Sequence, residues 1–279
     1  MRRVLAHPSL VIGLAGTLLF AVIGLLSMVW TPYPIEQIVV ARRFLPPSPE
    51  HWLGTDNLGR DMASLVMAGT YTSFLVAAIA VAIGAGIGVP LGLAAAAWGG
   101  AVEWLVLRLS DFVFAFPAIV VAILITALIG PGAVNAIVAI GIFNIPVFAR
   151  VARGGALSIA TLDFVAAGRL AGLGNAAIAY RHLLPNIMSL IIVQGTIQLS
   201  LGILSEAGLS YVGLGTQPPE TSLGLMLRDA QGVFLIHPWL TLVPGLCIVL
   251  IVIALNIAGD GLRDAIDPRL RQGETHVAS

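Results

Sequence analysis

The sequence contains few charged residues and no lysine. Of its 279 residues, 10% are charged and 58% are hydrophobic, whereas a soluble domain carries about 25% charged residues. So few polar residues cannot cover a water-facing surface, which predicts an integral membrane protein. All 14 basic residues are arginine. A P-loop binds phosphate through the lysine of GxxxxGK[ST], so this chain is not itself a P-loop ATPase.

Cysteine and metal-binding patterns are also scarce. The single cysteine, Cys247, lies in an apolar run, so it forms no intrachain disulfide, and it matches no metal-ligand spacing. His51 and His237 are isolated in polar segments, and we expect no metal site from them. The GLGT at 213–216 is expected to be a turn and not a phosphate-binding loop. A net charge of zero gives no argument for a nucleic-acid partner.

Long apolar runs predict six transmembrane helices and an all-α fold. A bilayer core is about 30 Å thick and takes about 20 apolar residues as helix. The first run, 9–30, follows Arg2 and Arg3. A cleavable signal peptide is the alternative, but its apolar core would be about 7–15 residues long and would precede a small-residue cleavage site. Residues 1–31 are therefore assigned to a cytoplasmic N-terminus and a retained first helix. The other helices are expected at about 70–97, 104–129, 133–152, 187–206 and 239–259.

The polar segments between these helices predict the orientation. Residues 32–68 and 207–238 are expected to be external segments, 162–185 a cytoplasmic loop, and 261–279 a cytoplasmic tail that follows a transmembrane domain at 69–260. One side then holds ten arginines and the other side four. Arginine is enriched in cytoplasmic loops, so both termini are predicted to be cytoplasmic.

Three glycines in the second predicted helix recur at every fourth residue. Gly84, Gly88 and Gly92 therefore share one face. Small residues at this spacing allow two membrane helices to approach closely. A lipid-facing, glycine-rich helix is the alternative.

The segment 162–186 is too polar for lipid and too helical in composition for an open loop. Its apolar stripe comprises Leu162, Val165, Ala166 and Leu170. Asp163 lies in the first turn, where a negative charge suits the helix dipole. Gly172 and Gly174 are expected to end this helix at a corner. Asn175 then caps a second short helix with Ala176, Tyr180 and Leu183 or Leu184 on one face, and Pro185 starts the next crossing. The stripe would bury itself in a protein groove or, alternatively, in the membrane surface.

This segment resembles the EAA loop of ABC-importer permeases, the cytoplasmic coupling helix that docks on the ATPase subunit. The resemblance falls on Ala166, Ala167 and Gly168, on Gly172, and on the stretch from His182 to Pro185. Alanine at 166 replaces the glutamate of the motif, and Asp163 lies nearby. The resemblance implies an ATPase-coupling role for Asp163, Ala166, Ala167, Gly168, Arg169, Gly172, His182 and Pro185.

Four further stretches narrow the resemblance: HWLGTDNLGRD at 51–61, LSDFVFAFP at 109–117, EAGLSYVGLGTQPP at 206–219, and NIAGDGLRDAIDPRLR at 256–271. They resemble the C-type permease of the dipeptide, oligopeptide and nickel ABC importers. The resemblance implies a type I importer fold and half of a translocation pore for di- or oligopeptides in a prokaryotic inner membrane. It also implies a B-type permease partner, two ABC ATPase subunits that bind ATP and Mg²⁺, and an external substrate-binding protein. No catalytic residue or cofactor is expected on this chain.

Polar residues within the crossings are the remaining candidates. Gln194 and Gln198 share a helix face and either line the pore or bind a neighbouring helix. Glu206, at the outer end of the fifth crossing, either forms structural hydrogen bonds or lines an outer gate. Asn144 and Asn256 are expected to bond between helices. Alternative functions are import of nickel, glutathione or another small solute, an ATPase-independent secondary transporter or channel, and a structural membrane subunit.

Overall fold

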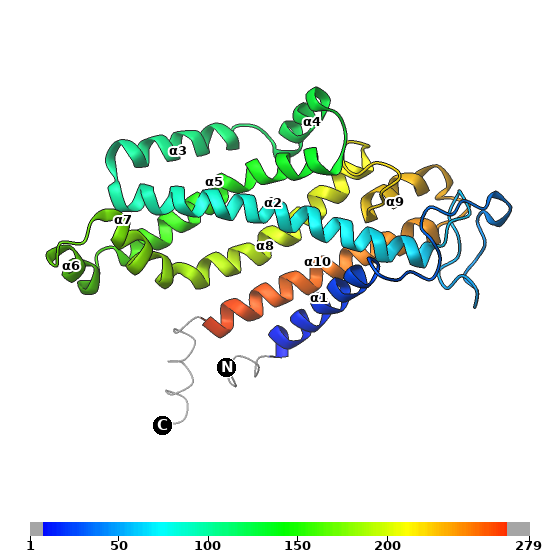
Figure 1. Ribbon diagram of the computed structural model, residues 1–279, viewed down its shortest axis with the longest axis horizontal. Helices are drawn as coiled ribbons and strands as arrows, with labels where there is room; N and C mark the ends of the chain where they lie inside the picture. The colour runs from blue at the N-terminus through cyan, green and yellow to red at the C-terminus, as the bar shows by residue number, and fades with distance from the viewer. Residues whose placement is uncertain (1–7, 267–279) are drawn as a thin grey trace.

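The structure, a computed structural model, describes residues 8–266 and consists of helices joined by irregular segments (Figure 1). Within these residues the strand-like pairing is limited to an isolated bridge between Thr55 and Asp61. The predicted tail beyond Ile266 and the arginines at 2, 3, 269 and 271 lie outside the described residues.

Five of the predicted crossings are present as long apolar helices. They are α1 (Pro8–Leu26), α2 (Met62–Trp98), α5 (Ala133–Ile159), α8 (Leu184–Tyr211) and α10 (Trp239–Ile266). By length and composition each can cross a membrane. The all-helical membrane fold expected from the composition is therefore confirmed.

The crossing predicted at 104–129 is wrong as a single helix. The chain instead forms α3 (Gly100–Phe114) and α4 (Ala118–Ile129), which bend by 82° relative to each other. Pro117 lies at the break with an extended ψ of 133°. Proline has no backbone N–H to donate and disfavours a helical conformation in the residue before it, so one helix ends and another begins here. Counted as one broken span, the pair brings the number of crossings to six.

The predicted boundaries are too short at several helix ends. α5 continues seven residues beyond the expected end at 152, and α8 continues from the expected 206 to Tyr211. A helix can continue past the membrane where its charged residues find partners. Arg150, just before the expected end of α5, and Arg153, just after it, pair with acidic residues of α3.

The glycine face of α2 packs against α5, which confirms the predicted helix contact. A Cβ on Gly84 would meet Asn144, and one on Gly88 would meet the carbonyl oxygen of Ile145 and lie 2.8 Å from the Cβ of Phe148. A Cβ on Gly92 would meet the carbonyl oxygen of Ala149. The two helices lie side by side along most of their length (Figure 1). Small residues thus allow the two backbones to approach closely.

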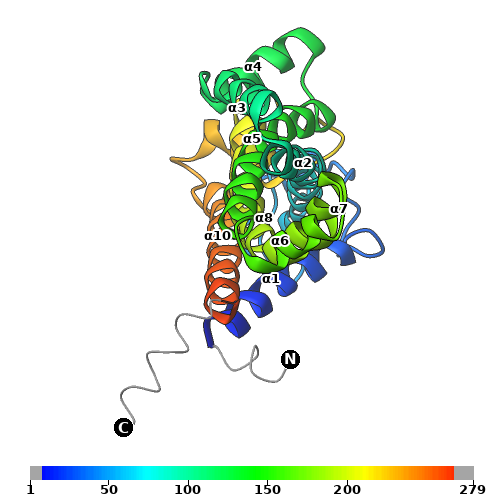
Figure 2. The same cartoon turned by 90° about the vertical axis from the view of Figure 1, so that its left-hand side faces the viewer.

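The polar segments gather at opposite ends of the bundle. The short helices α6 (Asp163–Leu170) and α7 (Asn175–Ile178) lie at one end (Figure 1). Residues 32–61, α9 (Leu223–Ala230) and the turn η4 (Gln231–Val233) lie at the other end. The first turn of α1 and the last turn of α10 point toward the α6 end (Figure 1). Viewed from that end, α6 and α7 lie in front of α8 (Figure 2).

Candidate functional site

The segment that resembles a coupling loop forms a compact helical corner between α5 and α8. α6 is followed by α7, by the π-helical turn η3 (Ala179–Leu183), and by the first turn of α8. Pro185 lies in that first turn, where the chain continues from η3 into α8 without a break in the helix. We call residues 163–185 the coupling segment.

Gly172 forms the corner that ends α6. Its φ is +83°, which glycine adopts without the steric penalty that a side chain brings. The N–H of Leu173 donates to the carbonyl of Gly168 at 3.1 Å, and the N–H of Gly172 donates to that of Arg169 at 3.0 Å. These two bonds form a Schellman cap, which satisfies carbonyls that the helix end would leave unpaired.

Two details of the predicted corner are wrong. Gly174 has an ordinary φ of −70° and serves as the N-cap of α7, so it is not a second left-handed position. Asn175 is the first residue of α7 and makes no side-chain cap. The Schellman cap at Gly172 already turns the chain, so the second helix can begin without another special residue.

The buried face of the coupling segment differs from the predicted stripe. Val165 is fully buried and packs in a cluster with Ile178, Ala179 and Leu183, whereas Leu162, Ala166 and Leu170 are exposed. Ala176 and Tyr180 are exposed as well. The segment folds back on itself, so its own second half covers the Val165 side of α6, while the other three residues of the predicted stripe stay exposed.

Gly168 and His182 are brought together within the segment. A Cβ on Gly168 would lie 3.3 Å from His182 Nε2 and 3.4 Å from Leu173 Cδ1, both tight contacts. Glycine at 168 therefore lets α6 lie directly against the half-buried His182 ring. His182 also lies near Phe164, with ring centroids 6.0 Å apart. These residues fix the angle at which α6 projects from the bundle.

The outward face of α6 carries two alanines in its middle and a large apolar side chain near each end. Leu170 is 90% exposed. The exposed residues on the helix comprise Asp163, Phe164, Ala166, Ala167, Arg169 and Leu170. Alanine at 166, in place of the motif glutamate, thus faces away from the bundle. This face offers a neighbouring protein close backbone approach at the two alanines and the apolar side chains of Phe164 and Leu170, with a charge of each sign beside them.

Two ion pairs near the coupling segment were not predicted. Arg150 Nη2 donates to Asp111 Oδ1 at 2.6 Å, and Arg153 Nε donates to Glu103 Oε1 at 2.8 Å. Both join α3 to the extended end of α5. The two acidic residues of α3 lie eight positions apart, and the two arginines of α5 lie three positions apart. Each set therefore shares one face of its helix, and that spacing was the available sequence signal. The pairs brace the helix from which the coupling segment emerges.

The polar residues of the crossings form a hydrogen-bonded chain of amides. Gln194 Nε2 donates to Gln198 Oε1 at 3.3 Å, and Gln198 Nε2 donates to Asn144 Oδ1 at 2.7 Å. Gln198 and Asn144 are 6% and 4% exposed. Asn144 thus bonds between helices, as predicted. Asn256 does so too, because it accepts from Ser200 Oγ at 3.2 Å.

Gln198 and Asn144 also line a cleft of about 350 Å³ between α4, α5 and α8. Its other walls are mainly apolar and include Ile119, Phe143 and Leu201. We call this space the amide cleft. Gln194 is not part of its lining, although it bonds to Gln198.

Glu206 is fully buried and bonded on both carboxyl oxygens. Oε2 accepts from Ser73 Oγ at 2.7 Å, and Oε1 accepts from Ser210 Oγ at 2.6 Å and from Thr216 Oγ1 at 3.3 Å. The carboxyl therefore joins α2, α8 and the segment that follows α8. Of the two predicted roles, this geometry favours structural hydrogen bonding.

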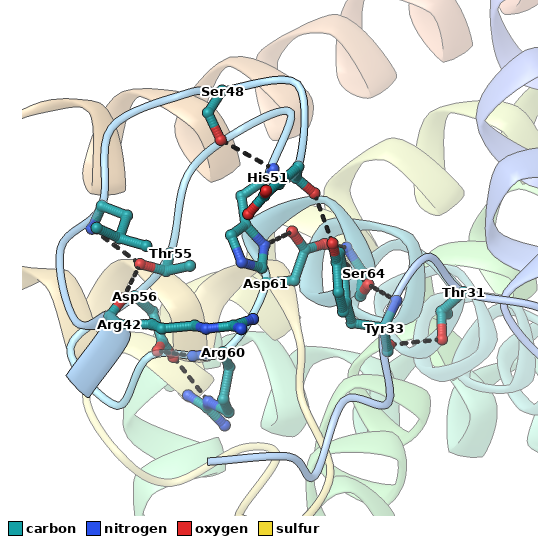
Figure 3. Close-up of polar contacts among 12 residues, drawn as sticks. Thr31, Tyr33, Arg42, Ser48, His51, Thr55, Asp56, Arg60, Asp61 and Ser64 are labelled. Atoms are coloured by element: carbon teal, nitrogen blue, oxygen red, sulfur yellow. Dashed lines mark hydrogen bonds and ion pairs between the residues drawn. The ribbon is translucent and has the colours of Figure 1, made fainter. Parts of the chain in front are cut away.

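At the opposite end of the bundle, the HWLGTDNLGRD stretch organises residues 32–61 (Figure 3). His51 Nδ1 lies 2.9 Å from Asp61 Oδ1, and Asp61 Oδ2 accepts from the N and Oγ of Ser64 at 2.8 and 2.9 Å. Tyr33 N donates to Ser64 Oγ at 3.0 Å. Asp61 thereby caps the N-terminus of α2. His51 is buried within this network.

A charged cluster joins this stretch to α9. Arg60 Nε donates to Asp56 Oδ2 at 2.7 Å, and Arg60 Nη2 lies 3.5 Å from Asp229 Oδ2 (Figure 3 shows the Arg60–Asp56 pair). Burial raises the pKa of Asp229 above its ordinary value, against the opposing effect of Arg60. His237 is engaged in packing, with its ring stacked on Phe44 at 4.4 Å between centroids.

Comparison with known proteins places these features in a family. Residues 88–272 match the family described as binding-protein-dependent transport system inner membrane component. The chain is 37% identical over 261 residues to the dipeptide transport system permease protein of Alkalihalophilus pseudofirmus, covering 94% of this chain and 86% of that protein. It is 39% identical over 266 residues to the glutathione transport system permease protein of Pectobacterium atrosepticum, covering 95% and 88%.

The fold agrees with a solved transporter. An inward-facing structure of the MetNI methionine ABC transporter aligns with a TM-score of 0.60 at 21% identity, covering 74% of this chain and 98% of that one. This likeness shows the type I importer permease fold. Together with the sequence matches, it shows that the chain belongs to the inner-membrane components of binding-protein-dependent transport systems, within the C-type permeases of the peptide and nickel ABC importers.

Proposed function

We propose that this chain forms half of the translocation pore of an ATP-driven importer of short peptides, with α6 as its contact to an ATPase subunit. The outward face of α6 is the observation that carries this proposal. Leu170 is 90% exposed there, while Val165 on the opposite side holds the helix to the bundle. A helix fixed on one face and apolar at its free tip suits docking in a protein groove better than solvent exposure.

The proposed orientation puts the coupling segment and both termini in the cytoplasm. Arg169 and Arg181 lie in the segment, and Arg150 and Arg153 lie in the last turns of α5 beside it. Cytoplasmic loops are enriched in arginine. Residues 32–61 and α9 then face outward, where a substrate-binding protein would dock.

The proposed partners are a B-type permease that supplies the other half of the pore, two ABC ATPases and an external binding protein. ATP and Mg²⁺ would be bound by the ATPases, because this chain has no lysine for a P-loop. Closure of the ATPase pair would displace α6. The Schellman cap at Gly172 and the contact between Gly168 and His182 would keep the coupling segment rigid. It would therefore pass that movement on to α5 and α8.

The relatives support peptides as the cargo. One is a dipeptide permease and another is a permease for glutathione, itself a small peptide, and their identities to this chain are similar at 37% and 39%. A cargo class that includes both is a short peptide of two or three residues.

Uptake by proteoliposomes tests this proposal. The importer is purified with its partner subunits, and accumulation of labelled dialanine and of labelled glutathione is measured with ATP or a non-hydrolysable analogue inside. We expect accumulation of at least one peptide only with ATP and the binding protein. Uptake by this chain without ATPases would contradict the proposal and indicate a secondary transporter.

A further inference from the structure

An exposed arginine lies on the apolar outward face of α3. This helix is at the edge of the bundle, packed against α2 and α5 (Figure 1). Trp104, Leu105 and Phe112 on its outward face are each more than half exposed. Arg108 lies three or four positions from each of them and is exposed as well. An arginine among lipid-facing apolar side chains is costly unless an anion accompanies it.

The acidic residues of α3 do not supply that anion, because both are paired with α5. Asp111, three residues after Arg108, accepts from Arg150 Nη2 at 2.6 Å. Glu103 accepts from Arg153 Nε at 2.8 Å. Among the ion pairs of residues 8–266, none includes Arg108. Each of the two pairs balances its own charges, so Arg108 remains as the unbalanced positive charge on this face.

The same ion pairs fix the depth of Arg108 in the membrane. The run of α5 from 133 to 149 carries no charge. Its seventeen residues correspond to about 25 Å of helix at about 1.5 Å per residue, which is most of a hydrocarbon core of about 30 Å. The two arginines just after this run bond to α3 at Glu103 and Asp111. Arg108 lies between these two residues, and therefore at the level of the lipid headgroups on the side of the coupling segment.

Trp104 holds the guanidinium group of Arg108 in place. The central guanidinium carbon lies 5.9 Å from the centroid of the Trp104 ring, within the distance of about 6 Å at which a cation and an aromatic ring attract each other. Tryptophan is also enriched at membrane–water interfaces. A guanidinium over a ring face keeps N–H groups free to donate, and their geometry matches two oxygens of a phosphate. The pair therefore presents donors to a lipid phosphate.

We propose that Arg108 and Trp104 bind the headgroup phosphate of a phospholipid of net negative charge, in the leaflet on the side of the coupling segment. Such a lipid fits better than a zwitterionic one, because the cation of a zwitterionic headgroup already balances its own phosphate. Leu109 and Phe112, further along α3 toward the centre of the membrane, contact the acyl chains. The site needs neither the cargo nor the ATPase and is independent of the function proposed above.

Quenching of a fluorophore by spin-labelled lipids tests the proposal. The chain has one cysteine, so Cys247→Ser combined with Ala101→Cys gives a single labelling site. Ala101 is exposed and lies seven residues before Arg108 on the same face of α3, about 10 Å away. The labelled full-length chain is reconstituted in phosphatidylcholine bilayers. Spin-labelled phosphatidylglycerol or spin-labelled phosphatidylcholine is then added in increasing amounts.

Half-maximal quenching should need about a fivefold lower mole fraction of phosphatidylglycerol than of phosphatidylcholine, the effect of one arginine near the membrane surface. Arg108→Gln keeps the approximate size, removes the charge and should abolish this preference. Trp104→Leu should weaken it. Arg108→Lys should retain part of it, because the charge remains while the two-pronged donor geometry is lost.

Arg43→Gln is the matched control. It removes another exposed arginine, from residues 32–61 at the opposite end of the bundle, and should leave the preference unchanged. No preference in the wild-type chain, or the same preference with Arg108→Gln, would overturn the proposal. Repetition with the assembled importer should give the same preference. Its loss on assembly would also overturn the proposal, because a partner protein would then cover Arg108.

Discussion

Replacement of Glu206 should destabilise the fold strongly unless the new side chain keeps the hydrogen bonds. Its carboxyl is 0% exposed and accepts from Ser73, Ser210 and Thr216. Glu206→Ala removes all three acceptor contacts and leaves a cavity between α2 and α8. Glu206→Gln keeps the shape and one oxygen, and its new N–H₂ group can donate to a hydroxyl oxygen.

The magnitude follows from the number of hydroxyls left unpaired. A buried polar group without its partner costs about 1–3 kcal/mol. Three such groups, one of which can relax toward backbone acceptors, give a loss of at least about 3 kcal/mol for Glu206→Ala. That loss corresponds to roughly a 150-fold change in the unfolding equilibrium. Glu206→Gln should lose about 1 kcal/mol, since each hydroxyl retains a bonding partner.

Unfolding of the purified chain in mixed micelles, followed by circular dichroism during titration with sodium dodecyl sulfate, measures this difference. Glu206→Ala should unfold at a much lower detergent fraction than wild type, with Glu206→Gln between them and close to wild type. Equal midpoints for Glu206→Ala and wild type would refute the structural role. Equal losses for both variants would contradict the assignment of the stability to the retained hydrogen bonds.

Three further predictions concern other parts of the chain. Gly172→Val should reduce ATP-dependent uptake while the chain remains in the membrane, because φ at 172 is +83° and a side chain there costs about 1–2 kcal/mol; Gly172→Asn should be tolerated, and normal uptake by the valine variant would contradict this. Gly88→Leu should destabilise the chain by about 1–3 kcal/mol or more in the same unfolding assay, since its Cβ would lie 2.8 Å from that of Phe148, whereas Gly86→Leu should have no effect. Burial raises the folded-state pKa of Asp229 above 3.8, so its contribution to stability is present below pH 3.8 and is lost as pH rises through the raised value. Asp229→Asn should therefore match or exceed wild-type stability at pH 7 and show less decline with rising pH, and a clear loss at pH 7 would contradict this reasoning.

The crossings were predictable because hydropathy reports burial in lipid directly. The GPG at 130–132, within the run without charge from 112 to 149, located the end of α4 at Ile129 and the start of α5 at Ala133. The break at Pro117 was missed because the surrounding residues are uniformly apolar, so that hydropathy does not change where the helix bends. The extensions of α5 and α8 were missed because charge marks where lipid ends, not where a helix ends.

In the coupling segment, the periodicity of apolar residues predicted a helix but not which of its faces is buried. The glycine corner at 172 followed from composition, and the structure gives it the expected positive φ. The face that is buried did not follow, because the stripe from Leu162 to Leu170 carries no information on which segment covers it. The chain covers Val165 with residues that follow the corner, a long-range choice that depends on Gly168 fitting against His182.

The amide cleft needed the structure more than any other feature. Gln194 and Gln198 lie four residues apart and so share a helix face, which made them candidates for lining the pore or binding a neighbouring helix. Asn144 lies 54 residues from Gln198, and only the packing of α5 against α8 joins them. The buried Nδ2 of Asn144, which has no hydrogen-bond partner at the end of this chain of amides, has no sequence signal.

Docking of α6 on an ATPase subunit is the central claim, and Leu170→Glu tests it most directly. Leu170 is 90% exposed, so the substitution leaves the folded bundle intact. Wild-type and variant chains are purified from their native membranes in mild detergent, and bound proteins are identified and quantified by mass spectrometry. The account predicts that wild type recovers a second permease and P-loop ATPases, and that the variant keeps the permease but loses most of the ATPase. Recovery of the folded wild-type chain alone, or equal ATPase recovery with the variant, would contradict it.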